Sequence, residues 1–151
     1  EEAAPYLLER AQIYMNNDQA RNAMLDYDAY YKAVNGQVND LFYYYREQAA
    51  LKARQYQRAL DDIVKAVELS PKDLTYRAEH AVVNLRVGRY EESMKILNEI
   101  LKDEPKYGEA YRLLGLCQIQ LKKTDEACGN FNKAKELGDP NVDELIKKYC
   151  K

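Results

Sequence analysis

The sequence predicts an all-α protein built from stacked helical hairpins, and two observations support this prediction. The first is a repeat of thirty-four residues: YQRALDDIVKAVELSP, from Tyr56 to Pro71, returns as YEESMKILNEILKDEP, from Tyr90 to Pro105. The second is a composition of 46% hydrophobic and 32% charged residues with only 6 Gly and 4 Pro, which is typical of helical globular proteins. A short hairpin cannot cover its own apolar surface, so repeated hairpins must stack. We therefore expect a right-handed α-α superhelix with a concave inner face.

Sliding the sequence by one period aligns residues of the same kind in several columns. The first column contains small residues, the second contains large apolar residues, and the third contains apolar residues of either size. The aligned residues are Ala59, Ser93 and Ala127; Ile63, Leu97 and Phe131; and Ala66, Ile100 and Ala134. Within the second helix of a unit these positions recur at i, i+4 and i+7, which places them on one helical face.

The repeat divides the chain, taken as one domain over 1–151, into four units and a final helix. Each unit is a first helix, a turn such as the one at Gly88, and a second helix that a following Pro interrupts. A surplus of two residues between the first two units falls in the loop VNGQVND. Asn141, with Glu144 three residues later, predicts a capping box that opens the final helix. The predicted units are 4–37, 40–73, 74–107 and 108–141, and the capping helix is 142–150.

On these residues the chain resembles the tetratricopeptide repeat proteins. Unit 108–141 carries most of that family's pattern, in Tyr111, Leu114, Gly115, Ala127, Phe131, Ala134 and a late Pro140. Unit 40–73 departs from the pattern at Arg46 and Glu47, where Leu and Gly are usual. Charge at a tight helix crossing requires a salt bridge or a local shift of the backbone.

The resemblance implies a non-enzymatic scaffold that binds a protein or peptide partner in its concave groove, without a cofactor. In the family the first helix of each hairpin lines that groove. Tyr44 and Tyr45 are consecutive helical residues and cannot share one face, so we expect at least one of them to face the groove. The implied groove residues are Leu8, Gln12, Leu41, Tyr44, Tyr45, Gln48, Lys52, Ala78, Val82, Arg86, Arg112 and Leu116.

Other classes of function are not favoured. A formal net charge of -2 argues against nucleic acid, which needs a basic surface. His80 is the only histidine, so no histidine-based metal site is expected, and no residue is assigned a catalytic role. No apolar stretch is long enough to span a membrane. The positions at which co-chaperone repeats grip an acidic C-terminus hold Leu8, Gln12, Tyr45, Thr75 and Glu79 here, which do not form a basic clamp.

Three features of the sequence admit more than one interpretation. Cys117, Cys128 and Cys150 are interpreted as apolar fillers of packed helices, with a Cys117–Cys128 disulfide as the alternative. The chain begins with Glu1 rather than Met, which leaves room for a removed leader, so the compartment is left unassigned. The alternative function is that of a self-associating segment of a longer repeat array, either as a homo-oligomer or stacked on further repeats.

Overall fold

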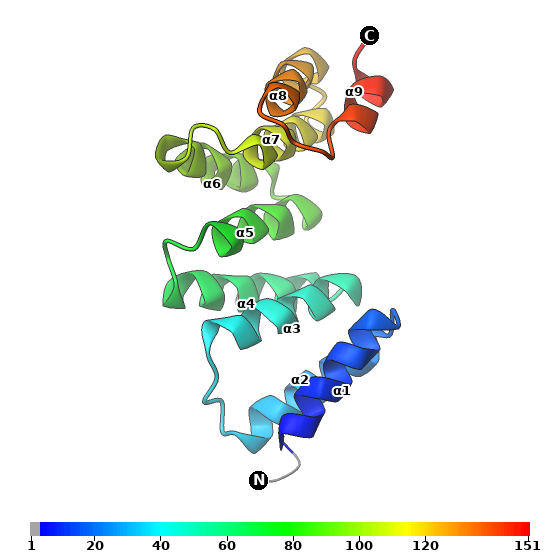
Figure 1. Cartoon of the computed structure of the whole chain (residues 1–151), viewed down its shortest axis with the longest axis vertical. Helices are drawn as coiled ribbons and strands as arrows, with labels where there is room; N and C mark the ends of the chain where they lie inside the picture. The colour runs from blue at the N-terminus through cyan, green and yellow to red at the C-terminus, as the bar shows by residue number, and fades with distance from the viewer. Residues whose placement is uncertain (1–3) are drawn as a thin grey trace. The chain divides into compact units, whose positions relative to one another are not determined.

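The computed structural model describes residues 4–151, and this range folds into helices joined by turns and short loops (Figure 1). Its helices are α1 (Ala4–Asn16), α2 (Ala20–Ala33), α3 (Asp40–Lys52), α4 (Tyr56–Leu69), α5 (Leu74–Arg86), α6 (Tyr90–Asp103), α7 (Gly108–Gln120), α8 (Thr124–Glu136) and α9 (Asp143–Tyr149). The pairs α1–α2, α3–α4 and α7–α8 pack as hairpins. In the fourth pair, α5–α6, the Ser93 hydroxyl donates to the Ala81 carbonyl oxygen at 2.7 Å. The chain divides into two compact units: unit 1, residues 1–76, and unit 2, residues 77–151.

Each hairpin turns through one residue in the left-handed region of the backbone. Glycine adopts this conformation readily, whereas other residues adopt it at a cost. Only one of these four turns has glycine at this position. The positions of the other turns follow from the thirty-four-residue repeat. The turn residues are Asp18 (φ 56°), Arg54 (φ 59°), Gly88 (φ 82°) and Lys122 (φ 60°).

The columns of the repeat form the centre of the hairpins. Every one of the nine aligned side chains is fully buried, from Ala59 in α4 to Ala134 in α8. The small column lets two helices approach closely, and Ser93 uses that approach for its hydrogen bond to α5. The side chains of the large apolar column fill the space beside the two helices of the hairpin. The periodic residues of the sequence are therefore the residues of the core.

Gly115 on α7 lies directly against the ring of Phe131 on α8. A Cβ atom at Gly115 would lie 2.4 Å from Cε1 and 2.6 Å from Cδ1 of that buried ring. We expect Gly115→Ala to lower the free energy of unfolding by about 1–3 kcal/mol, as overpacking of a core does, and chemical denaturation measures the change. Gly129→Ala on the same hairpin is the control, because nothing lies within 4 Å of its Cβ position, and it should raise stability by about 0.5–1 kcal/mol. A neutral Gly115→Ala would contradict the close contact.

The start of α9 differs from the sequence prediction. The helix begins at Asp143, and Val142, rather than Asn141, is its N-cap residue, without a side-chain hydrogen bond. The predicted capping box is therefore wrong. The Asn141 backbone N–H instead donates to Asp139 Oδ1 at 2.8 Å, and the apolar Val142 is buried in the cluster that contains Phe131. The residue that precedes α9 is therefore a buried apolar one and not a side-chain cap.

The interpretation of the cysteines is corrected in part. Cys117 is a buried free thiol, as expected of an apolar filler, and burial raises its pKa. Cys128 on α8 and Cys150 after α9 form a disulfide, with their Cα atoms 5.7 Å apart, so neither is a simple filler and a Cys117–Cys128 bond is not formed. The disulfide ties the end of α9 to the last hairpin.

Candidate functional site

A cavity with a volume of about 470 Å³ opens in unit 1, between the first two hairpins. Four predicted groove residues line it, which are Leu8, Gln12, Leu41 and Tyr45. The remaining lining residues, which the sequence did not single out, are Tyr27, Tyr30, Gln37, Val38, Asn39 and Phe42. We call this cavity the tyrosine pocket.

The loop between α2 and α3 contributes one wall of the tyrosine pocket. It contains the surplus residues found in the sequence, and Gln37, Val38 and Asn39 face the cavity. The Asn39 side chain also caps α3, because its Oδ1 accepts the Phe42 backbone N–H at 3.0 Å, a favourable N-cap arrangement. The same residue thus starts α3 and borders the site.

Aromatic rings from two hairpins form the floor of the tyrosine pocket. Phe42 on α3 meets Tyr27 of α2 edge-on, with ring centroids 5.8 Å apart, and stacks on Tyr30 at 5.6 Å. Burial raises the pKa of Tyr27 to about 12, so this phenol is neutral at ordinary pH. Rings packed in this way form a rigid surface.

The lining of the tyrosine pocket consists entirely of uncharged side chains. Gln12, Gln37 and Asn39 supply amide groups, while Leu8, Leu41 and the rings supply apolar surface. An amide group both donates and accepts hydrogen bonds, which suits the peptide backbone. A charged ligand group entering this cavity would lose hydration without gaining an opposite charge.

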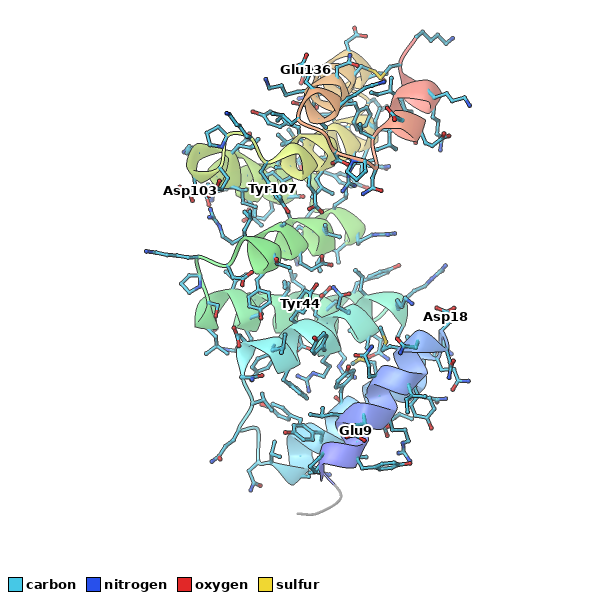
Figure 2. The ribbon with its side chains drawn as sticks, in the orientation of Figure 1. Glu9, Asp18, Tyr44, Asp103, Tyr107 and Glu136 are labelled. Carbon is cyan, nitrogen blue, oxygen red and sulfur yellow. A yellow bond between two sulfur atoms is a disulfide. The ribbon has the colours of Figure 1, made fainter. Side chains whose placement is uncertain are left out.

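Tyr44 and Tyr45 occupy different environments, as expected for consecutive helical residues. Tyr45 is 42% exposed and lines the tyrosine pocket. Tyr44, labelled on α3 in Figure 2, is half-buried and contacts two rings, those of Tyr45 (5.7 Å between centroids) and Tyr76 (5.3 Å). Of the two, Tyr45 borders the cavity.

The other predicted groove residues do not line this cavity. In unit 1, the Gln48 amide donates to Glu47 Oε2 at 3.4 Å, and the exposed Lys52 pairs with Asp18 at 3.0 Å. In unit 2, Ala78 is only 4% exposed, Arg112 pairs with Asp139 at 2.9 Å, and Leu116 packs against the buried cluster around Phe131. Val82 is half-buried and Arg86 is exposed.

A repeated ion pair holds each hairpin of unit 1 together beside the site. Arg10 binds both carboxylate oxygens of Asp26, at 2.7 and 2.6 Å. Arg46 binds both oxygens of Asp62, each at 2.8 Å. The salt bridge expected from the unusual Arg46 is therefore confirmed. Bidentate pairs of this kind fix geometry as well as charge.

Groups of three or more His, Cys, Asp or Glu placed to hold a metal ion are not found within residues 4–151. The half-buried His80 has a pKa lowered by burial. Across the same residues, none of the helices is both long and apolar enough to cross a membrane.

The repeated helical hairpins define a helical-repeat protein. Proteins of this class serve as scaffolds for protein–protein interactions. The family models agree: "Anaphase-promoting complex, cyclosome, subunit 3" matches residues 16–100, more than half of the chain, and "Tetratricopeptide repeat" matches residues 78–142. The chain belongs to the tetratricopeptide repeat family. Proteins of this family are generally non-enzymatic scaffolds.

Several curated proteins are similar over part of this chain. The small glutamine-rich tetratricopeptide repeat-containing protein 2 of Mycosarcoma maydis is 29% identical over 99 residues, which are 66% of this chain and 28% of that protein. Heat shock protein STI1 of Saccharomyces cerevisiae is 31% identical over 101 residues, 64% of this chain and 17% of that protein. The chain therefore spans less than a third of the length of these relatives.

Solved structures share the fold. YrrB, described as a TPR protein with an unusual peptide-binding site, superposes with a TM-score of 0.81 at 19% identity, covering 97% of this chain and 74% of that one. A MamA structure gives a TM-score of 0.74 at 21% identity, covering 98% and 77%. The predicted fold class, that of all-α tetratricopeptide repeat superhelices, is confirmed. At these identities the likeness concerns the fold alone.

Proposed function

We propose that this chain is a non-enzymatic scaffold that holds a segment of a partner protein in the tyrosine pocket, through one uncharged apolar or aromatic anchor side chain. The observation that carries the proposal is a cavity of about 470 Å³ with an entirely neutral lining. Rigid aromatic anchors of this kind dominate the binding energy of many peptide interfaces. The predicted groove residues outside the pocket, such as Gln48 and Lys52, stay predictions.

The chemistry of the pocket selects the type of partner segment. Leu8, Leu41 and Tyr45 offer apolar surface for a large side chain, and burying such a side chain contributes about 1.5–3 kcal/mol. Gln12 and Gln37 supply hydrogen bonds to the backbone on either side of the anchor. An acidic anchor would be disfavoured, because no lining residue could pair with it.

The named relatives raise an alternative partner. Heat shock protein STI1 is similar to part of this chain, and the co-chaperone repeats considered above grip an acidic C-terminus. The matching positions in the tyrosine pocket hold the neutral Leu8, Gln12 and Tyr45. We therefore favour an apolar anchor over an acidic tail.

A peptide panel with a matched pair of chain variants tests the proposal. The panel consists of short labelled Ala- and Ser-based peptides that carry a central Phe, Leu or Asp, and fluorescence polarisation measures their binding. We expect the Phe and Leu peptides to bind and the Asp peptide not to bind. Tyr45→Ala should weaken binding by about tenfold or more, since one large anchor is worth about 1.4 kcal/mol or more.

Tyr56→Ala is the control for Tyr45→Ala. Tyr56 is 38% exposed, close to the 42% of Tyr45, but it begins α4 and does not line the pocket. Its replacement should leave peptide affinity unchanged. Preferential binding of the Asp peptide, or equal losses in the two variants, would contradict the proposal.

A further inference from the structure

The α2–α3 loop, residues 34–39, differs from the other loops that join one hairpin to the next. The corresponding loops are 70–73 after α4 and 104–107 after α6, and both are two residues shorter. In the longer loop, Asn35 (φ 52°) and Gly36 (φ 72°) are consecutive residues in the left-handed region of the backbone. None of the left-handed residues in the described part of the chain falls in either shorter loop. The additional length and the unusual backbone therefore occur in the loop that borders the tyrosine pocket.

The α2–α3 loop is held at both of its ends. The Gly36 backbone N–H donates to the Tyr31 carbonyl oxygen at 2.8 Å, and a Cβ atom at Gly36 would lie 3.0 Å from the Tyr31 hydroxyl oxygen. The Tyr31 ring is itself held, because it stacks on Phe42 with centroids 6.0 Å apart and lies 4.8 Å from the Arg46 guanidinium. At the other end, Asn39 caps α3. The two residues between these contacts therefore have a defined position.

Val38 is the apolar residue that the loop contributes to the cavity. It is half-buried, whereas its neighbours Gln37 and Asn39 are exposed, and all three line the tyrosine pocket. The Val38 backbone N–H donates to the Gly36 carbonyl oxygen at 3.0 Å, which ties the position of Val38 to that of Gly36. A β-branched side chain has few rotamers. Val38 is therefore a stiff part of the wall and cannot easily move aside for a larger ligand.

The longer loop occurs together with looser packing of the two helices that it joins. The helices α2 and α3 are in less extensive contact than α6 and α7, the corresponding pair in unit 2, which the shorter loop 104–107 joins. Figure 1 shows the α2–α3 loop crossing from the first hairpin to the second. The cavity of about 470 Å³ lies where this loop, α1, α2 and α3 meet. The loop is thus a structural determinant of the cavity as well as part of its lining.

We infer that the α2–α3 loop determines which partner segments the tyrosine pocket accepts: Val38 limits the size of the anchor side chain, and Gly36 positions Val38. This inference rests on the proposed function and narrows it, since the accepted anchor is an apolar side chain matched in size to the space that Val38 leaves. Leu8, Leu41 and Tyr45 supply apolar contact to any such anchor, so they contribute affinity. The loop contributes selectivity, because one methylene group more or less in an apolar pocket changes binding by about 10–200-fold.

The readout for this inference is the ratio of the affinity for the Leu peptide to the affinity for the Phe peptide, measured by the same polarisation assay. Val38→Phe should raise this ratio by about tenfold or more, because the new ring fills space that the larger anchor needs. Val38→Ala should lower the ratio by several-fold. Both peptides are measured on the same folded molecules, so a loss of stability in a variant does not change the ratio.

Val34→Phe is the matched control for Val38→Phe. Val34 belongs to the same loop and is also half-buried, but it does not line the tyrosine pocket. The same substitution four residues away should therefore leave the ratio as it is in the native chain. An equal change of the ratio in both variants would mean that the loop acts through general disturbance and not through Val38.

A double-variant cycle tests whether Gly36 positions Val38. In a Gly36→Ala background, where the added Cβ atom meets Tyr31 and the left-handed backbone is strained, the loop should shift. The effect of Val38→Phe on the ratio should then shrink to about threefold or less, as coupling between the two sites requires. Gly138→Ala is the control: it introduces the same backbone strain in unit 2 (φ 82°), where nothing lies within 4 Å of its Cβ position. The full Val38→Phe effect should persist in that background.

The outcomes separate this inference from the proposed function. If the native chain binds the Leu and Phe peptides, Tyr45→Ala weakens both, and the Val38 variants leave the ratio unchanged, the inference is wrong and the proposed function stands. If the native chain binds neither peptide, both are wrong. An undiminished Val38→Phe effect in the Gly36→Ala background would show that Gly36 has only a structural role, and would overturn its assignment as a positioning residue.

Discussion

Arg46→Leu is expected to lower the free energy of unfolding of unit 1 by about 3–5 kcal/mol, the usual cost of removing one partner from a buried ion pair. The Asp62 side chain is 6% exposed and relies on Arg46, which donates to both its oxygens at 2.8 Å. Leucine is the residue that the repeat pattern would place at this position, so the substitution fits the helix crossing. The loss therefore reports the stranded carboxylate, and urea denaturation followed by circular dichroism measures it.

Two controls separate charge from packing. The double variant Arg46→Leu/Asp62→Leu should recover most of the lost stability, because an apolar pair can replace a buried ion pair at little cost. Lys65→Ala removes the exposed Lys65–Glu68 pair (2.9 Å) and should change the free energy of unfolding by less than about 1 kcal/mol. If Arg46→Leu costs no more than Lys65→Ala, the pair does not stabilise the hairpin.

The same variant should show a characteristic pH dependence. Burial raises the pKa of Asp62, and the Arg46 guanidinium opposes this rise, so the variant should raise that pKa further. An unfolded Asp titrates near about 3.9. Between that value and the higher folded pKa, the folded state binds more protons than the unfolded state, and stability must fall as pH rises. The deficit of Arg46→Leu relative to the native chain should therefore shrink as pH is lowered from about 7 towards about 4.

The helical hairpins could be predicted from the sequence because their core repeats with the same period as the chain. Burial of Ala59, Leu97 and Phe131 follows directly from the column that each occupies. The need for a partner for Arg46 could also be predicted, because a charge at a packed position must be neutralised. These features depend on local helical geometry, which a single sequence encodes well.

The candidate site could be predicted only in part. Leu8, Gln12, Leu41 and Tyr45 were expected from the first helix of each hairpin, whereas Tyr27 and Tyr30 come from α2, which the family pattern places away from the groove. They reach the cavity in the space that the α2–α3 loop borders. The two surplus residues in that loop were the available signal, but their effect on the spacing of two hairpins depends on loop conformation.

The disulfide could not be predicted because it depends on where a terminal segment returns. Cys128 and Cys150 are 22 residues apart in sequence, and their contact requires α9 to fold back onto α8. That return depends in turn on the burial of Val142, which shifts the helix start away from the expected Asn141. Such contacts arise from packing between helices and produce no periodic pattern in the sequence.

Reduction of the Cys128–Cys150 disulfide is expected to weaken the attachment of α9 by about 3 kcal/mol, the loop entropy of a 22-residue closure. The helix has only seven residues, Asp143–Tyr149, and a helix so short is not stable without packing. Without the bond, only the burial of Val142, Leu145, Ile146 and Tyr149 against the Phe131 cluster opposes its release. Amide hydrogen exchange in α9 should therefore accelerate by about a hundredfold when a thiol reductant is added.

Exchange in α1–α4 serves as the internal control, since unit 1 contains no cysteine and its rates should not change. The double variant Cys128→Ser/Cys150→Ser should exchange rapidly in α9 without reductant and should not respond to it. Cys117 is buried, so its thiol should stay unreactive towards a thiol-specific reagent while α9 detaches. Unchanged α9 protection after reduction would mean that apolar packing alone holds the helix. Faster exchange that spreads through α7 and α8 would mean instead that α9 and the last hairpin unfold as one cooperative element.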